Sequence, residues 1–276
     1  MWTDLGSKGT ASWKGHAVLH VLRSCDTLST LSLSLGPTDG SSAAHLGHIS
    51  NNLSIFVSFS TLASFTLESA IWLTDLALLL DGWPSLKELT LHSLRGDCSR
   101  MPPPPTTKSI QRLSIRTNTL SEQHACWLIA HQRLTHLSIA LPGLPSTFFT
   151  ALAHLSPTLT SLRLTNRFAA KGAPAPPTAS PLLPFLVLSS VLEELQLSGD
   201  VLGPAEKLDE LLAAVSKVGT VAKLWIDDGV REPLERALRK GELAQLAEVV
   251  SVGRKGPAVK SFEQAMDERG IELSRE

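Results

Sequence analysis

The sequence predicts an α/β fold in which short parallel strands alternate with helices and stack into a curved solenoid. Three observations lead to this prediction. A hexamer of the form apolar-x-x-apolar-x-apolar recurs along the 276 residues, its copies are spaced by 24 or 25 residues over the middle of the chain, and helical patterns fill the gaps. Because a fixed period of this length is typical of repeat architectures, we expect about nine irregular stacked units.

The hexamer fits eight segments well. They are LSTLSL (28–33), LASFTL (62–67), LKELTL (86–91), IQRLSI (110–115), LTHLSI (134–139), LTSLRL (159–164), LEELQL (192–197) and VAKLWI (221–226). A ninth copy, AEVVSV (247–252), fits less well. The steps between successive starts are 34, 24, 24, 24, 25, 33, 29 and 26, so the repeat boundaries stay open in residues 34–62 and 165–192.

Side-chain direction in a strand explains the hexamer. Alternate residues of a strand point to opposite faces. In LTHLSI we therefore expect Leu137 and Ile139 to point inward, with Leu134 entering the same core, while His136 and Ser138 point outward. One unit cannot bury such a row alone, but stacked units make it continuous, and each buried leucine then contributes roughly 1.5–3 kcal/mol.

In most units a helix is predicted in the return segment, which leads from one strand back to the start of the next. Segments with helical apolar spacing and capping residues are SEQHACWLIAH (121–131), STFFTALAHL (146–155), PAEKLDELLAAVSKVG (204–219), EPLERALRKG (232–241) and PAVKSFEQAMDERG (257–270). One return segment, RMPPPPTTK (100–108), is expected to be extended, because consecutive prolines favour polyproline II.

These elements predict one repeat domain with short flanks. Residues 1–27 form an N-terminal segment with a partial repeat, residues 28–252 the solenoid, and residues 253–276 a helix that closes it. Inserts rich in Gly, Pro and small polar residues are expected near 36–52, 100–108 and 169–181.

Composition excludes several classes of protein. The net charge of −1 argues against a nucleic-acid partner, since neutralising phosphates needs an excess of Lys and Arg. The spacing of the three cysteines fits neither a disulfide framework nor a zinc site, which indicates a reducing compartment. The uncharged stretch 40–67 holds too many Ser, Thr and Asn side chains to cross a bilayer, and no secretory signal is recognised. We expect a monomer in the cytoplasm or nucleus without a membrane partner.

The hexamers and their spacing resemble leucine-rich repeats over about residues 28–252. The full motif of that family continues with Asn and a further apolar residue, and IQRLSIRTNTL matches it with Asn118 and Leu120. LEELQLSGDVL has Asp200 at the Asn position and LTHLSIALPGL has Pro142, so the repeats are irregular. The resemblance implies a parallel sheet on the concave side of the solenoid, with helices and extended loops on the convex side.

Irregular repeats with Pro-rich inserts and the closing FEQAMDERGIEL (262–273) resemble the repeat region of fungal F-box/leucine-rich-repeat proteins. In that family the repeats capture a substrate, and an F-box docks on the adaptor of a ubiquitin ligase. No segment near residue 1 resembles the LPxE opening of an F-box. Two expectations therefore stand: a substrate-recognition region whose F-box lies upstream, or a stand-alone repeat protein that regulates or inhibits a partner.

Catalytic and metal-binding patterns are weak. The sequence lacks the P-loop, dinucleotide, zinc-protease and nucleophile-elbow motifs. His124, Cys126 and His131 could supply metal ligands, but residues two apart on a helix point in different directions. We predict no catalytic residue, metal or cofactor, and a hydrolase with an unrecognised His/Cys site is the alternative of another class.

The outward strand positions form the predicted partner-binding face. On the concave side we expect a modest basic centre and, towards the C-terminal end, an outward tryptophan, which is a residue type that dominates interface energetics. The candidate binding residues are Arg112, Arg116, His136, Arg163, Lys223 and Trp225. The competing interpretations are that the C-terminal segment covers Trp225 and that the arginines are ordinary solvated charges on a polar surface.

Overall fold

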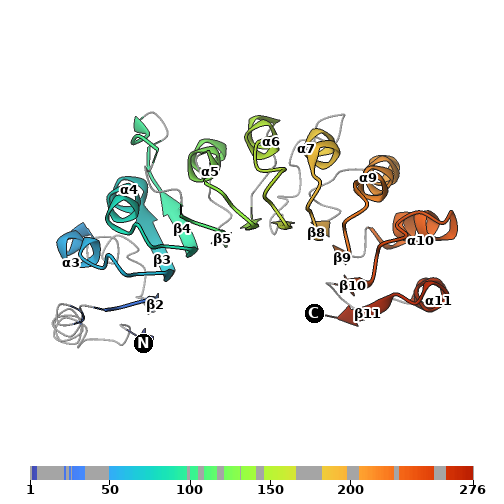
Figure 1. Cartoon of the computed structure of the whole chain (residues 1–276), viewed down its shortest axis with the longest axis horizontal. Helices are drawn as coiled ribbons and strands as arrows, with labels where there is room; N and C mark the ends of the chain where they lie inside the picture. The colour runs from blue at the N-terminus through green and yellow to red at the C-terminus, as the bar shows by residue number, and fades with distance from the viewer. Residues whose placement is uncertain are drawn as a thin grey trace. The chain divides into compact units, whose positions relative to one another are not determined.

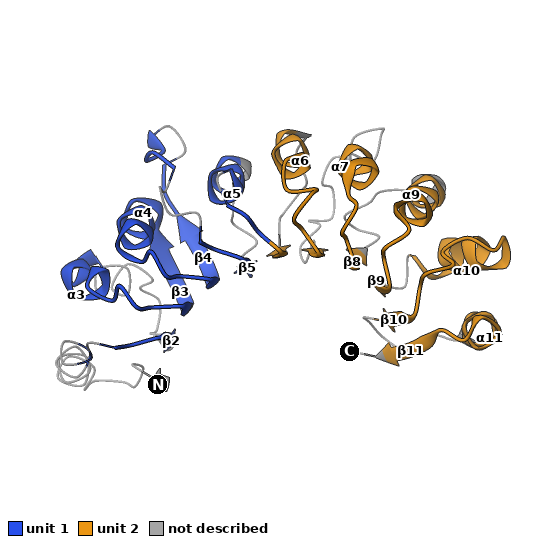
Figure 2. Ribbon diagram, viewed as in Figure 1, with its two compact units in different colours: residues 1–134 blue, residues 135–276 orange. Residues whose placement is uncertain are grey.

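A computed structural model describes most of the chain. The described residues are 2–4, 22, 25, 27–34, 50–97, 100–104, 109–116, 121–130, 132–140, 146–165, 182–197, 205–226, 230–251 and 259–275. The chain divides into two compact units, Met1–Leu134 and Thr135–Glu276, which Figure 2 colours separately. Each unit is described by itself.

Unit 1 is a parallel sheet with helices on one face (Figure 1). Its strands follow one another in sequence order: β1 (Trp2–Asp4), β2 (Thr30–Ser34), β3 (Ser64–Trp72), β4 (Glu88–Arg95) and β5 (Arg112–Ile115). Its described helices are α3 (Leu53–Val57), α4 (Leu73–Gly82) and α5 (Glu122–Ile129).

Unit 2 repeats the same arrangement. Its parallel strands are β6 (His136–Ala140), β7 (Ser161–Thr165), β8 (Glu194–Leu197), β9 (Lys223–Ile226), β10 (Glu248–Ser251) and β11 (Glu272–Arg275), again paired in sequence order. Its described helices are α6 (Ser146–Ala153), α7 (Leu183–Leu188), α9 (Ala205–Val218), α10 (Arg231–Arg239) and α11 (Val259–Arg269). The predicted α/β class, with parallel strands alternating with helices, is confirmed.

The inward positions of the hexamers form the core of each unit. In unit 1 the buried hexamer residues are Leu31, Leu33, Leu62, Phe65, Leu67, Leu86, Leu89, Leu91, Ile110, Leu113, Ile115 and Leu134. In unit 2 they are Leu137, Ile139, Leu159, Leu162, Leu164, Leu192, Leu195, Val221, Leu224 and Ile226. Each of these side chains is at most 4% exposed, so the predicted inward direction of the first, fourth and sixth positions holds there. Leu28, which opens the first hexamer, is only half-buried.

A repeated backbone contact sets the register where each strand begins. The carbonyl of Ser29 accepts the N–H groups of Ala63 and Ser64 at 2.8 and 3.0 Å. Thr135 does the same for Thr160 and Ser161 in unit 2, at 2.8 and 3.0 Å. Other second-position carbonyls repeat it, namely those of Ala63, Lys87, Thr160, Glu193 and Ala222. Because each carbonyl uses both lone pairs, neighbouring hexamers align position by position.

The register of the ninth hexamer differs from the prediction by one residue. Glu248 pairs with Lys223 and Val249 with Leu224, so the hexamer is LAEVVS (246–251) rather than AEVVSV (247–252). The sixth, inward position is then Ser251, a polar residue, whereas the template requires an apolar residue there. Arg231 Nη2 donates a hydrogen bond to Ser251 Oγ at 2.8 Å, which satisfies this buried hydroxyl.

Several elements lie outside the predicted pattern. Strand β1 precedes the first hexamer, and β11 follows the predicted C-terminal helix, which is α11. Strands β3 and β4 continue beyond their hexamers after a register shift between Leu67 and Ala70. Helices α3, α4 and α7 were not among the predicted helices.

Helix ends follow the predicted capping residues. Ser121 Oγ accepts the N–H of His124 at 3.2 Å and so caps α5. Gly219 and Gly270, at φ +71° and +65°, end α9 and α11 in the left-handed region that glycine adopts without strain. Ser146 is the first residue of α6, one position later than an N-cap.

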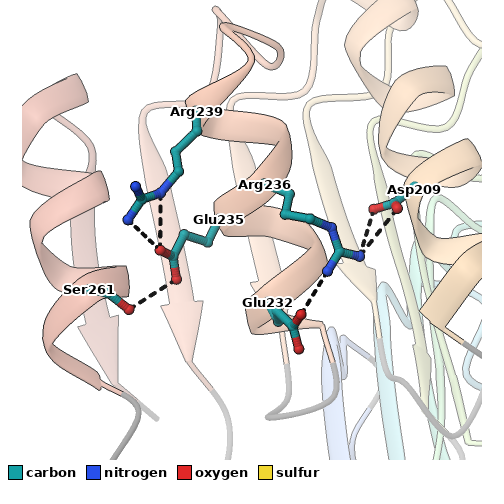
Figure 3. A network of polar contacts seen from close by, with 6 residues as sticks. All are labelled: Asp209, Glu232, Glu235, Arg236, Arg239 and Ser261. Atoms are coloured by element: carbon teal, nitrogen blue, oxygen red, sulfur yellow. Dashed lines mark hydrogen bonds and ion pairs between the residues drawn. The ribbon is translucent and has the colours of Figure 1, made fainter.

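Charged side chains link the helices of unit 2 to one another (Figure 3). Arg236 on α10 donates to Asp209 on α9 at 3.2 Å and to Glu232 at 2.8 Å. Glu235 accepts from Arg239 at 2.7 Å and, from α11, from Ser261 at 3.2 Å. These contacts are partly or fully exposed and contribute at most about 1 kcal/mol each.

The proline-rich return segment has no regular secondary structure over residues 101–104. Trp127 of α5 donates its indole N–H to the Pro102 carbonyl at 3.0 Å, which holds this segment against the helix. The predicted inserts near 36–52 and 169–181 lie outside the described residues, apart from residues 50–52. Among the helices that the structure describes, none has both the length and the apolar character needed to cross a bilayer.

Candidate functional site

The outward strand residues form rows that run across neighbouring strands, opposite the face on which the described helices lie (Figure 1). We name each row by its place in the hexamer. In unit 1 the third-position row is Thr30, Ser64, Glu88 and Arg112, and the fifth-position row is Ser32, Thr66, Thr90 and Ser114. In unit 2 the third-position row is His136, Ser161, Glu194, Lys223, Glu248 and Glu272, and the fifth-position row is Ser138, Arg163, Gln196, Trp225, Val250 and Ser274.

In unit 1 the third-position row is joined laterally by polar contacts. Arg112 Nη1 lies 3.4 Å from Glu88 Oε1, and Ser64 Oγ donates to Glu88 Oε2 at 3.3 Å. The Arg112 side chain remains 60% exposed, so the ion pair is screened by water and leaves the guanidinium accessible to a partner.

Arg116 and His92 lie next to one another at the ends of their hexamers. The backbone N–H of Arg116 donates to the Leu91 carbonyl at 3.0 Å, which continues the register of β4 and β5 by one residue. Both side chains are exposed. With Arg112, they place three basic side chains on unit 1, whereas His136 and Arg163, which also belong to the predicted basic centre, lie in unit 2.

The fifth-position row of unit 1 consists of hydroxyl side chains only. Ser32, Thr66, Thr90 and Ser114 are half-buried and directly adjacent across four strands. Their hydroxyls make no hydrogen bond to any other residue in the described part of the chain. This row is therefore a neutral strip that can both donate and accept hydrogen bonds.

In unit 2 the third-position row carries charges of both signs, with Lys223 between Glu194 and Glu248, and is also joined laterally. Ser161 Oγ donates to Glu194 Oε2 at 2.7 Å. Glu248 lies between two donors, with Lys223 Nζ 2.8 Å from Oε2 and Ser274 Oγ 2.9 Å from Oε1. These contacts lower the pKa of the Glu248 carboxyl below its ordinary value, mainly through the hydrogen bond from Lys223, against a smaller opposing effect of desolvation.

His136 is the first residue of this row, and its ring contacts the side chain of Thr135, the preceding residue in the sequence. Its Nδ1 lies 2.9 Å from Thr135 Oγ1, and its side chain is half-buried. The predicted outward direction of His136 agrees with its pairing to Ser161 in the third-position row.

Trp225 lies in the outward fifth-position row, but it is not an exposed anchor. Only 3% of the residue is exposed. Arg163 Cζ lies 4.0 Å from the ring centroid and Lys223 Nζ lies 4.7 Å from it. Of the two interpretations left open by the sequence, burial agrees with a covered rather than an exposed tryptophan; two cations pack on the indole, and its neighbour in the row, Val250, is also buried.

The predicted binding residues divide between the units. Arg112 and Arg116 belong to unit 1, whereas His136, Arg163, Lys223 and Trp225 belong to unit 2 and lie in its two outward rows. Sequence reasoning did not include Glu248 and Ser274 among the face residues. Glu248 could have been placed on this face from Leu246, two residues earlier, because Leu246 is the first position of the correct hexamer.

The possible His/Cys site does not assemble in the described residues. On α5, His124 is 3% exposed and Cys126 is half-buried, so the histidine rather than the cysteine packs deepest. Burial lowers the His124 pKa and favours the neutral imidazole. His131 lies outside the described residues, and within them no group of three His, Cys, Asp or Glu side chains is placed to hold a metal.

Glu193 and Glu194 are adjacent acidic residues where strand β8 begins. Glu193 is exposed, while Glu194 points outward and accepts the hydrogen bond from Ser161. The two carboxyls therefore lie on different sides of the backbone where β8 begins, as expected for consecutive residues of an extended chain.

Comparison of the sequence with models of known protein families finds no matching family, and comparison with curated proteins finds no match either.

Proposed function

We propose that this protein is a non-catalytic scaffold of the leucine-rich-repeat type that binds a protein partner on the outward face of its parallel strands. One observation supports this proposal most strongly. Inward hexamer positions are almost uniformly Leu, Ile, Val or Phe, whereas adjacent outward positions vary among Arg, Lys, His, Glu, Gln, Ser, Thr, Trp and Val. Packing limits the inward residues most strictly, whereas most outward residues are exposed or half-buried and are available for recognition.

The composition of the outward face also suits a protein partner. Unit 1 presents exposed arginines and a neutral hydroxyl row, and unit 2 presents a row with charges of both signs. Protein interfaces use such mixtures of polar groups around arginine and aromatic residues, whereas a nucleic-acid interface needs a clear excess of positive charge.

A narrower proposal follows from the resemblance to fungal F-box/leucine-rich-repeat proteins. The strands would then form the substrate-recognition region of a ubiquitin-ligase receptor. A stand-alone regulator of a partner would use the same face without the ligase adaptor. Co-purification of the adaptor with the protein expressed from its native locus supports the receptor, and a partner complex without the adaptor supports the regulator.

The docking face is tested with two matched triple variants. The first, Arg112→Ala, Arg116→Ala and Lys223→Ala, removes three outward cations. The second, Lys217→Ala, Arg239→Ala and Lys240→Ala, removes three exposed cations from α9, from α10 and from the residue that follows α10. A partner identified by cross-linking to the full chain is expected to bind the first variant at least about tenfold more weakly and the second like the wild type. Equal binding by both variants, or loss only in the second, would overturn the proposal.

A further inference from the structure

Arg163 is a cation on the outward face of unit 2 whose charge no described carboxylate balances. Lys223 on the same face forms an ion pair with Glu248 at 2.8 Å. Arg163, by contrast, makes no hydrogen bond or ion pair with any residue in the described ranges, and its one recorded contact is with the Trp225 ring. The neighbouring carboxylate on β8, Glu194, is engaged by the Ser161 hydroxyl.

Trp225 holds the Arg163 guanidinium in place. The side chain starts on β7 and reaches Trp225 on β9, so it crosses the intervening strand over a span of roughly 10 Å. A guanidinium that packs on an aromatic ring uses its π-face for that contact and keeps its in-plane N–H donors for another acceptor. Because the ring already restricts the long side chain, a ligand loses less conformational entropy on binding to it.

Gln196 adds a neutral hydrogen-bonding group at the same place. It pairs with Arg163 on one side and with Trp225 on the other, so it lies between them in the fifth-position row. Its side-chain amide is half-buried and makes no hydrogen bond to another residue that the structure describes. The amide N–H and the guanidinium N–H groups can therefore be shared by one planar anion.

The charge of the neighbouring row limits the ligand to a single negative group. Glu194, Glu248 and Glu272 lie in the third-position row, about 7 Å along the strands from the fifth-position row. A chain of phosphates would meet these carboxylates and be repelled, whereas one carboxylate can approach Arg163 between neutral neighbours.

We propose that Arg163, held on Trp225 and flanked by Gln196, binds the carboxylate of an Asp or Glu side chain in a segment of the protein partner. This inference rests on the proposed function, since it names the chemical group by which the partner contacts unit 2. The acidic side chain of the partner would contact Arg163 in the fifth-position row. Its neighbours in the partner segment should be neutral or basic, because a basic neighbour can pair with Glu194 or Glu272 in the third-position row.

The test follows the Arg163 Nε–H signal of the full-length protein by NMR. The probe is the peptide N-acetyl-Gly-Glu-Gly-amide, and the matched control is N-acetyl-Gly-Gln-Gly-amide, each added to concentrations on the order of 10 mM. The Arg163 signal is assigned by its loss in Arg163→Gln. It is expected to shift saturably with the glutamate peptide and to stay in place with the glutamine peptide.

Variants sharpen the result. Arg163→Lys keeps the charge but not the planar pair of donors, and it is expected to weaken binding of an identified partner about tenfold. Arg239→Gln removes an exposed arginine from α10 and is expected to leave that binding unchanged. An Arg163 signal that ignores the glutamate peptide, moves equally with the glutamine peptide, or responds more strongly to inorganic phosphate overturns the carboxylate assignment.

The two proposals fail in different ways. If the partner loses affinity for the outward triple variant while the Arg163 signal ignores the glutamate peptide, only the carboxylate site is wrong. If the glutamate peptide shifts Arg163 while the partner needs only the helix-side cations, the docking face is wrong.

Discussion

At the scale of single residues, position in the hexamer decides what a side chain does. Leu195, in the fourth position, is fully buried, whereas Glu193, in the second position just before β8, is exposed. The inward residue loses its contact with water and packs against the helices, while the other residue stays solvated. Their substitutions should therefore differ greatly in cost.

Leu195→Ala is expected to lower the free energy of unfolding by about 2–5 kcal/mol, because it removes buried methyl groups and leaves a cavity. Glu193→Ala is expected to change it by less than about 0.5 kcal/mol. Urea denaturation followed by circular dichroism measures both. Similar values for the two variants would mean that strand β8 is wrongly placed.

Glu248 gives a second prediction at the residue scale. Its pKa is lowered in the folded protein, mainly by the hydrogen bond from Lys223, so the ionised form stabilises the fold at pH values above the unfolded pKa. That stabilisation is lost as the pH falls through the lowered folded pKa. Lys223→Met should raise the Glu248 pKa, as measured by NMR titration of the side-chain carboxyl. An unchanged pKa would show that Lys223 does not contact Glu248.

Trp225 shows what the sequence could and could not predict about the candidate site. The hexamer correctly placed it in the outward row, because alternation along a strand is local. One of the groups that pack on its ring, Arg163, is 62 positions earlier in the chain and on a strand two places away. No local pattern carries that information, and the sequence therefore left open whether the tryptophan is an exposed anchor or is covered.

At the scale of elements, helix boundaries follow capping chemistry. The Ser121 side chain accepts the N–H of His124 at the start of α5. Ser121→Ala should lower the free energy of unfolding by about 1 kcal/mol, and Ser121→Asp should restore most of it, since both Ser and Asp cap helices well. Thermal unfolding of the three proteins tests this. If aspartate fails to rescue the alanine loss, the cap is not the cause.

The strand predictions succeeded where the inward residues are apolar and failed where they are not. Eight hexamers were placed in the correct frame because Leu, Ile, Val and Phe mark their inward positions. The ninth was shifted by one residue because Ser251 fills an inward position and is satisfied by Arg231. Strand β11 was missed because Glu272–Arg275 has only one apolar residue, Leu273, and is recognised by its pairing with β10.

At the scale of the whole molecule, the two units share one construction. In each, parallel strands pair in sequence order, inward apolar rows face the helices, and outward rows carry the varied polar residues. The sequence predicted this construction because it repeats. It could not predict the partner, since recognition depends on outward residues, which follow no repeated pattern.

The alternation of inward and outward side chains is the central claim, and cysteine accessibility tests it most directly. In a variant with the native cysteines replaced by serine, single cysteines are placed at Leu91 and His92 in unit 1 and at Leu162, Arg163, Leu164 and Thr165 in unit 2. Their rates of reaction with a water-soluble thiol reagent are then compared. Cysteines at the outward positions (His92, Arg163 and Thr165) should react at least about tenfold faster than those at the buried positions (Leu91, Leu162 and Leu164), because a buried thiol reacts only through local opening. Equal rates, or a maximum every three to four residues, would contradict the strand alternation and the docking face built on it.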